Sequence, residues 1–226
     1  GWRGTLHRRI AVALEMRHPD SPLVSERIGE HYRQAGESGK AFRYLATSAL
    51  NLWDRALGAE AWAVSEKAMV LSAAAQESMT RSSYLRSRLK LLRVRSSVTY
   101  NRGEWAHAEQ VLTSLQSTAD SLGEERLVAE SMLHRGIALR RLGREDEGFQ
   151  LIDTVVEQAR VSGDRSTFID GLRYLAIIAW ENGDLDRCEE LAGQGLVAAT
   201  GPGFDDGRAG ILVALTAVQA ERGQLA

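Results

Sequence analysis

The chain has one cysteine and only three prolines among its 226 residues. The single thiol, Cys188, excludes an internal disulfide framework and fits a reducing compartment. Scarce proline leaves long stretches free to form helices, because proline breaks a helix interior. No apolar stretch approaches the ~20 residues that a bilayer span needs, and no signal-peptide pattern opens the chain. These absences argue against secreted and membrane proteins and predict a cytoplasmic location.

Neither sign of charge is in excess. The chain carries 28 Lys and Arg against 30 Asp and Glu, so its formal net charge is −2 and its pI is about 6.3. This balance argues against direct binding of nucleic acid or of an anionic membrane surface. The chain opens on Gly1 rather than Met, and our expectation is that it is part of a longer protein.

Helical periodicity is abundant. Leu6, Ile10 and Leu14 recur at helical spacing in a leading segment that ends at a turn near Pro19. Further apolar-periodic segments follow, separated by Gly, Asp or Ser, at roughly 23–35, 38–55, 58–73, 79–102, 104–120, 124–142, 145–161, 165–182, 185–199 and 205–222. Nowhere does a β-branched run alternate with polar residues for long enough to predict a strand. The sequence therefore predicts an all-α fold of about eleven helices.

The helices repeat with a period of 40 residues. Two series of glycines keep this step. The first is Gly103, Gly143, Gly183 and Gly223. The second lies midway between the members of the first and is Gly123, Gly163 and Gly203. We interpret the first series as the turn inside a helix pair and the second as the turn between pairs. Small residues keep the period on both sides of the first series: Ser96, Gly136, Ala176 and Thr216 before it, and Ala108, Gly148 and Cys188 after it. They predict a close approach between the two helices of each pair.

These small and apolar positions around a turn glycine resemble the tetratricopeptide repeat (TPR) family, as do Ile28, Gly29, Tyr32, Gly36, Ala41 and Leu45. The resemblance covers about 23–226 and implies a right-handed α-α superhelix, a TPR-like solenoid. On this interpretation 1–226 is a single solenoid fragment. It has a leading helix and turn at 1–22, N-terminal repeats at 23–75, and three 40-residue repeats plus an incomplete fourth at 79–226. The period exceeds the family's usual 34 residues.

A second resemblance is narrower. The stretches Leu6–Ala11, Ala13–Glu15, His31–Gly36 and Lys40–Ala41 are similar to a segment of bacterial STAND-class signalling ATPases. In that class the segment joins a nucleotide-binding module to a TPR-like sensor, which implies a signalling or transcription regulator as the parent protein. It also implies that 38–55 is a helix shared by two pairs. No GxxxxGK[ST] phosphate-binding loop occurs in this chain, so the resemblance places any ATPase chemistry outside it.

Catalytic patterns are scarce. The five histidines show neither HExxH nor another paired metal-ligand spacing, so we predict no metal site and no cofactor. Cys188 stands at a small-residue position with no evident activating base, which favours a buried structural thiol over a nucleophile. We therefore predict that the chain is not an enzyme.

The most informative polar feature is the segment 81–102, which has seven basic residues and no acidic one. It is either a solvated helix face or part of a binding groove. In the TPR family the first helix of each pair lines the concave groove, and the family register maps this lining onto Arg93, Tyr100, Asn101, Arg140, Arg141, Arg173 and Trp180, with Ser97, Leu133, Ile137, Ile177 and Glu181 beside them. Arginine and aromatic side chains are suitable anchors for an acidic or extended peptide or a neighbouring domain.

The leading hypothesis is a non-catalytic protein-interaction or sensor module of a larger bacterial regulator. It would bind a protein or peptide partner, or another domain of the parent protein, in this groove. Two alternatives stay open. The groove could bind a small-molecule inducer between Trp180 and Tyr100, or an uncapped apolar face at the end of the array could make the chain a homo-oligomer.

Overall fold

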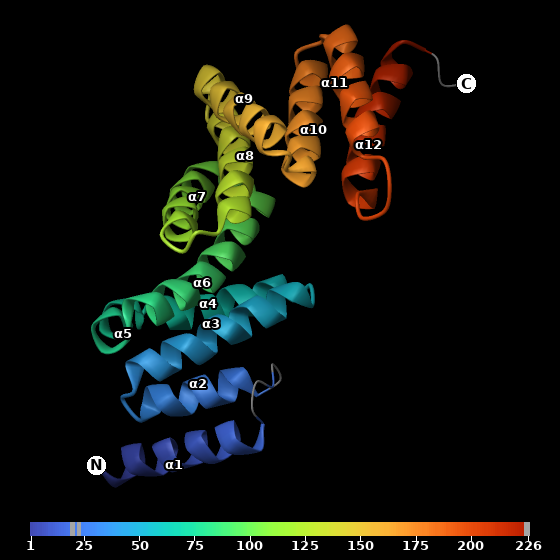
Figure 1. The fold of residues 1–226 in the computed structure, drawn as a ribbon. Helices are drawn as coiled ribbons and strands as arrows, with labels where there is room; N and C mark the ends of the chain where they lie inside the picture. Colours follow the sequence, from blue (N-terminus) through green and yellow to red (C-terminus); the bar gives the residue numbers. More distant parts are fainter. Residues whose placement is uncertain (19–20, 22–23, 224–226) are drawn as a thin grey trace. The chain divides into compact units, whose positions relative to one another are not determined.

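The computed structural model describes residues 1–18, 21 and 24–223, and all regular structure among them is α-helical. Twelve helices are present in this part of the chain (Figure 1). None of these helices is both long and apolar enough to cross a bilayer. Their contacts divide the chain into two units, Gly1–Glu124 and Glu125–Ala226, which we describe separately. The all-α prediction is confirmed.

Unit 1 holds the first seven helices: α1 (Trp2–Arg17), α2 (Ser25–Gln34), α3 (Ser38–Asp54), α4 (Gly58–Met69), α5 (Ser72–Ser78), α6 (Arg81–Asn101) and α7 (Trp105–Asp120). Helix α3 packs against both α2 and α4, as expected for a helix shared by two pairs, and α6 packs across α3 and α4. The predicted turn at 18–22 falls mostly on residues outside the described ones.

Helix α5 was not predicted. The helix predicted at 58–73 ends at Met69, where the chain turns through Val70 and Leu71. A short alanine-rich stretch then forms α5, which buries Ala75 and packs against α3. With seven residues, α5 is too short to show a helical period of its own, and its only buried side chain is a methyl group.

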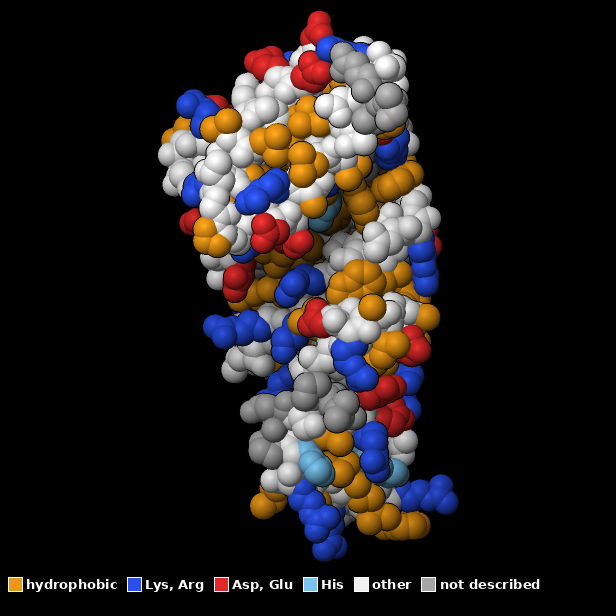
Figure 2. Space-filling view, turned by 90° about the vertical axis from the view of Figure 1, so that its right-hand side faces the viewer, with side chains coloured by type: hydrophobic (Ala, Val, Ile, Leu, Met, Phe, Trp, Pro, Cys, Tyr) orange, Lys and Arg blue, Asp and Glu red, His pale blue; other side chains and the backbone are white. Residues whose placement is uncertain are grey.

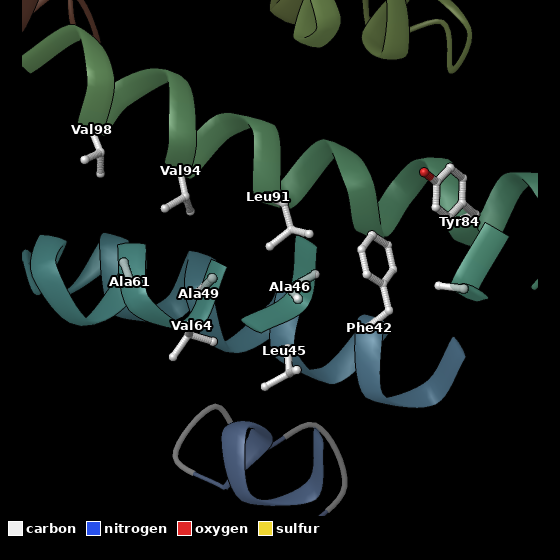
Figure 3. Packing of buried hydrophobic residues seen from close by; sticks show 12 residues of the cluster. Phe42, Leu45, Ala46, Ala49, Ala61, Val64, Tyr84, Leu91, Val94 and Val98 are labelled. Carbon is white, nitrogen blue, oxygen red and sulfur yellow. The ribbon is translucent and has the colours of Figure 1, made fainter. Parts of the chain in front are cut away.

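The core of unit 1 lies between α6 and the α3–α4 pair. Figure 3 shows Leu91, Val94 and Val98 of α6 directed toward Ala46 and Ala49 of α3 and Ala61 of α4. Each of these side chains is at most 5% exposed. Phe42 and Tyr84 extend this core at one end, with their rings stacked 5.5 Å apart. Burial of a fully apolar strip of this kind is the main term that stabilises a helix on its neighbours.

Helix α1 is fixed to α2 and α3 by the residues of the second resemblance. Tyr32 donates a hydrogen bond to Glu15 over 2.6 Å, and the Nδ1 atoms of His7 and His31 lie 2.8 Å apart. Arg8 pairs with Glu37 at 2.8 Å. Tyr32 is fully buried in the small core between the three helices. The similar stretches therefore meet at one helix interface rather than at a catalytic centre.

Unit 2 holds α8 (Glu125–Arg141), α9 (Glu145–Ser162), α10 (Arg165–Glu181), α11 (Leu185–Ala198) and α12 (Asp205–Glu221). Helices α8 and α9 form one pair, and α10 and α11 form the next. Helix α12 packs on both α10 and α11, as the first helix of a further pair would. The described part of unit 2 ends at Gly223, so the predicted end of the array lies outside it.

Both glycine series lie in turns, as predicted. All seven members have a positive φ, between 66° at Gly223 and 90° at Gly203. Gly103, Gly143 and Gly183 lie inside helix pairs, and the second series lies between pairs. Only glycine adopts this backbone conformation without a steric cost, which explains why the period is visible in the sequence.

Candidate partner-binding surface

The first helices of unit 2 present one common surface. Helix α10 packs against both α8 and α12. Residues one repeat apart meet across these helices: the rings of His134 and Tyr174 stand edge to face at 5.9 Å, and Arg126 donates a hydrogen bond to the Ser166 hydroxyl over 3.4 Å. The 40-residue period therefore places equivalent positions in contact.

Three of the predicted groove residues lie near the C-terminal ends of α8 and α10. Arg140 and Arg141 both pair with Glu181, at 3.1 and 2.6 Å. The Trp180 indole donates a hydrogen bond to Glu221 over 2.9 Å. The two arginines of α8 are thus bonded to a glutamate of α10, and the tryptophan of α10 is bonded to a glutamate of α12. An anionic partner at this end of the surface would have to displace Glu181.

Arg173, a fourth predicted residue, lines a pocket nearer the N-terminal ends of α8 and α10. The pocket has a volume of about 230 Å³. Helix α8 contributes Arg126, Glu130, Leu133 and His134, and α10 contributes Thr167, Asp170, Arg173 and Tyr174. The Arg173 guanidinium lies 4.2 Å from the centre of the Tyr174 ring and 3.8 Å from the Asp170 carboxylate. The wall formed by α8 and α10 is therefore pre-organised by contacts within the protein.

Burial shapes the electrostatics of this pocket. It lowers the pKa of His134 to about 4, with a further contribution from the positive charge of Arg173. It raises the pKa of Asp170 and that of Tyr174, although Arg173 works against both shifts. His134 is therefore neutral at physiological pH and can both donate and accept a hydrogen bond. Perturbed ionisable groups around one concavity are a feature of functional sites.

The remaining predicted residues, Arg93, Tyr100 and Asn101, belong to α6 in unit 1. Arg93 and Asn101 are exposed. Tyr100 is half-buried, with its ring edge-on to Trp105 at 5.3 Å. The structure therefore distributes the predicted residues over both units.

Sequence reasoning missed His134, Asp170 and Tyr174. The signal was present, because His134 and Tyr174 are one 40-residue repeat apart and each follows a predicted groove residue, Leu133 or Arg173. Each also precedes a residue of the predicted lining, Ile137 or Ile177, by three positions, and helical geometry puts residues three apart on the same face. What the sequence did not reveal is that Tyr174 is buried and that His134 and Asp170 are partly buried.

The described residues show little to support catalysis. Among them, no three His, Cys, Asp or Glu side chains lie together in a group that could hold a metal ion. Cys188 is fully buried, and burial raises the pKa of its thiol, which therefore stays protonated and weakly nucleophilic. Its predicted burial is confirmed.

Acidic and basic side chains of unit 2, in the upper part of Figure 2, are interspersed with hydrophobic ones on the face shown. No patch of one sign covers this face of the unit. On this face, unit 2 therefore presents mixed local charges rather than a field of one sign.

The sequence matches no protein-family profile and no curated protein. Solved structures do match. BtubC (BKLC) from P. vanneervenii has a TM-score of 0.63 and 14% identity, over 92% of this chain and 84% of that one. The nearly identical TPR-like repeats of a Podosopora anserina protein assigned as a kinesin light chain give a TM-score of 0.50 and 16% identity, over 97% and 96%.

The fold is TPR-like. At these identities the likeness establishes the fold alone. In TPR-like terms, α8, α10 and α12 are first helices, and the pocket and the glutamate-bonded residues lie on the surface that they share.

Proposed function

We propose that this chain is a non-catalytic protein-interaction module that binds a segment of a partner on the first helices of unit 2. Repeat folds of this kind commonly bind along an extended surface made by equivalent helices. The observation that carries the proposal is the pocket at Arg173, where partly buried ionisable side chains border a cavity.

The size of the pocket indicates what it would accept. Its volume of about 230 Å³ lies below the ~300–1,000 Å³ of typical small-molecule sites. It suits one anchoring side chain of a peptide better than a whole inducer. Two arginines and two carboxylates among the lining residues leave no net charge. An uncharged polar side chain such as an amide, which both donates and accepts, would match Asp170 and Arg173 together.

The other predicted residues extend this proposal. Arg140, Arg141 and Trp180 would bind the part of the partner that continues past the pocket, with an acidic side chain replacing Glu181. Arg93, Tyr100 and Asn101 would offer further contacts on unit 1.

The parent protein in this proposal is a bacterial signalling or transcription regulator that works in the cytoplasm. The resemblance to STAND-class ATPases in α1 to α3 and the single reduced thiol support it. The module would then bind either another domain of that regulator or a separate protein.

A peptide-display selection against the chain tests the binding proposal. Selected peptides should lose at least tenfold in affinity for R173E, because a central arginine of an interface commonly carries much of the binding energy. R187E is the matched control, since Arg187 is exposed on α11 and its one ion pair within the described residues is with Glu190, on the same helix. Peptides that bind R173E as well as the parent chain would contradict the proposal.

Self-association is a second candidate, favoured by the outer face of α1. Trp2, Leu6 and Met16 are 73%, 45% and 79% exposed on this one helix. Large apolar side chains gathered on one face commonly mark an interface. Analytical ultracentrifugation of the chain and of its W2A/L6A variant tests self-association. A dimer that the W2A/L6A substitutions abolish supports this candidate, and a monomer at all concentrations excludes it.

A further inference from the structure

We infer that unit 1 carries a binding site for a small organic anion, in a groove on α6 that is separate from the surface of unit 2. Helix α6 forms the floor of this groove, α4 and α5 form one wall, and α7 forms the other. The groove has a volume of about 350 Å³, within the range of small-molecule sites.

The charge of the groove has one sign. Its charged lining residues are Arg88 and Arg95 of α6, and His107 lines it from α7, with its Nδ1 atom 3.5 Å from the Glu104 carboxylate. Of the described residues that line the groove, none is acidic. Arg88 and Arg95 are seven residues apart, which brings both to nearly the same side of the helix. The groove therefore favours a negative group.

The two arginines differ in what already binds them. Arg95 pairs with Glu66, and its guanidinium lies 4.4 Å from the centre of the Trp62 ring. Its side chain is only 13% exposed. Arg88 is half-buried, and it has no hydrogen-bond or ion-pair partner among the described residues. A guanidinium that is partly removed from water and unpaired is stabilised by an incoming anion.

The remainder of the lining combines apolar side chains with the uncharged polar groups of Ser72, Gln110 and Ser114. Leu92 and Val111 are 5% and 7% exposed, and Met69 is half-buried beside them. At the α5 end, the hydroxyls of Ser72 and Tyr84 are hydrogen-bonded to each other at 2.9 Å. The groove thus combines apolar side chains with one available positive charge. Its ligand would be a compact molecule with an apolar body and a carboxylate, sulfonate or phosphate.

Two other cations of the basic segment are already bonded elsewhere. Lys90 points to α3, where it donates a hydrogen bond to Thr47 over 3.0 Å. Arg102 lies 5.0 Å from the centre of the Trp62 ring and 3.7 Å from Glu104. Of the two arginines that line the groove, Arg88 is the one without an ion-pair partner among the described residues.

Titration of the full chain with anilinonaphthalene sulfonate, an aromatic anion, tests this site. Its uncharged analogue phenylnaphthylamine is the matched probe. We expect the sulfonate to bind at least tenfold more tightly than the analogue, because a hydrogen-bonded charge pair is worth about that factor or more. R88Q should lose this preference, whereas R88K should keep part of it.

R86Q is the control variant, since Arg86 is exposed on the opposite side of α6. It should bind the dye as the parent chain does, and so should R173E. R88Q should also melt at the same temperature as the parent chain, because Arg88 has no hydrogen-bond or ion-pair partner to lose in the described part of the chain. Equal binding by R88Q, or equal binding of the two probes, would overturn the proposal. Displacement of the dye by a tetraglutamate peptide would overturn it too, in favour of a peptide site.

Discussion

Gly136 of α8 and Gly148 of α9 lie backbone against backbone. A β-carbon on Gly136 would come within 2.8 Å of the Gly148 carbonyl oxygen and 2.5 Å of the Ile152 side chain. Both glycines occupy small-residue positions of the 40-residue repeat, so the predicted close approach of the two helices is confirmed in this pair. The contact decides how the α8–α9 pair packs.

We therefore expect G136A to lower the free energy of unfolding of unit 2 by about 2 kcal/mol, because the helices must separate to admit the methyl group. Hydrogen exchange of α8 and α9 measures this. G193A is the control: no atom lies within 4 Å of a β-carbon there, and alanine should stabilise α11 by up to about 1 kcal/mol. Equal effects of the two substitutions would contradict this explanation.

Glu15 should control the attachment of α1. Burial works to raise the pKa of this carboxyl, but hydrogen bonds from Tyr32 and Tyr44 and the charge of Arg43 outweigh it and lower the pKa. E15A would leave two tyrosine hydroxyls without this acceptor and should cost about 2–3 kcal/mol of local stability. Faster hydrogen exchange confined to α1 and its contacts would show it.

The control for Glu15 is E30Q. Glu30 pairs with Arg33 on the surface of α2, where an ion pair is worth about 0–1 kcal/mol. Exchange of α1 that is unchanged in E15A, or equally accelerated in E30Q, would show that Glu15 is not the attachment point.

His134 should make unit 2 sensitive to acid. Its pKa is about 4 in the folded protein against an ordinary 6.5. Between these two pH values the unfolded chain therefore binds a proton at this histidine that the folded chain does not bind. Stability should accordingly fall as pH drops from about 6.5 to about 4, by up to ~3 kcal/mol. The raised pKa of Asp170 has the opposite effect on stability, because protonation of this carboxyl at low pH favours the folded state. NMR titration of the His134 ring measures the pKa directly.

The variant H134Q should be less sensitive to pH across this window, because glutamine does not titrate. Urea unfolding of both proteins at pH 7 and pH 4.5 makes the comparison. The same loss of stability in both proteins would assign the acid sensitivity to other groups.

Replacing Ala56 with glycine should stabilise unit 1. It ends α3 with φ at +60°, and it has the only positive φ among the described residues other than glycine. This conformation costs an alanine about 1–2 kcal/mol, and glycine avoids most of that cost. A56G should raise the free energy of unfolding of unit 1 by about 0.5–1 kcal/mol in urea titration.

A63G is the matched control for this substitution. Ala63 is exposed in the middle of α4, where glycine should destabilise the helix by about 1 kcal/mol. A loss of stability in both variants would show that the turn at Ala56 is not strained.

Local patterns account for the parts of the fold that the sequence predicted well. The turn glycines need a positive φ that other residues resist, so Gly103 and Gly163 mark helix ends without reference to the remainder of the chain. Cys188 and Gly148 are small because a helix packs against them, and the period repeats that requirement. Helix α5 escaped prediction because seven residues with one buried alanine carry almost no periodic signal.

The pairing of side chains is a different matter. Arg88, Arg95 and Lys90 are alike in the sequence, yet Arg88 and Arg95 line a groove in which only Arg95 pairs with a glutamate, and Lys90 bonds to Thr47 instead. Likewise, Arg141 pairs with Glu181, whereas Arg173 borders a pocket. The sequence by itself determined the helices, their turns and the 40-residue period, because those depend on neighbours close along the chain. Only the tertiary structure decided which charges are neutralised, because that depends on where separate helices bring their side chains.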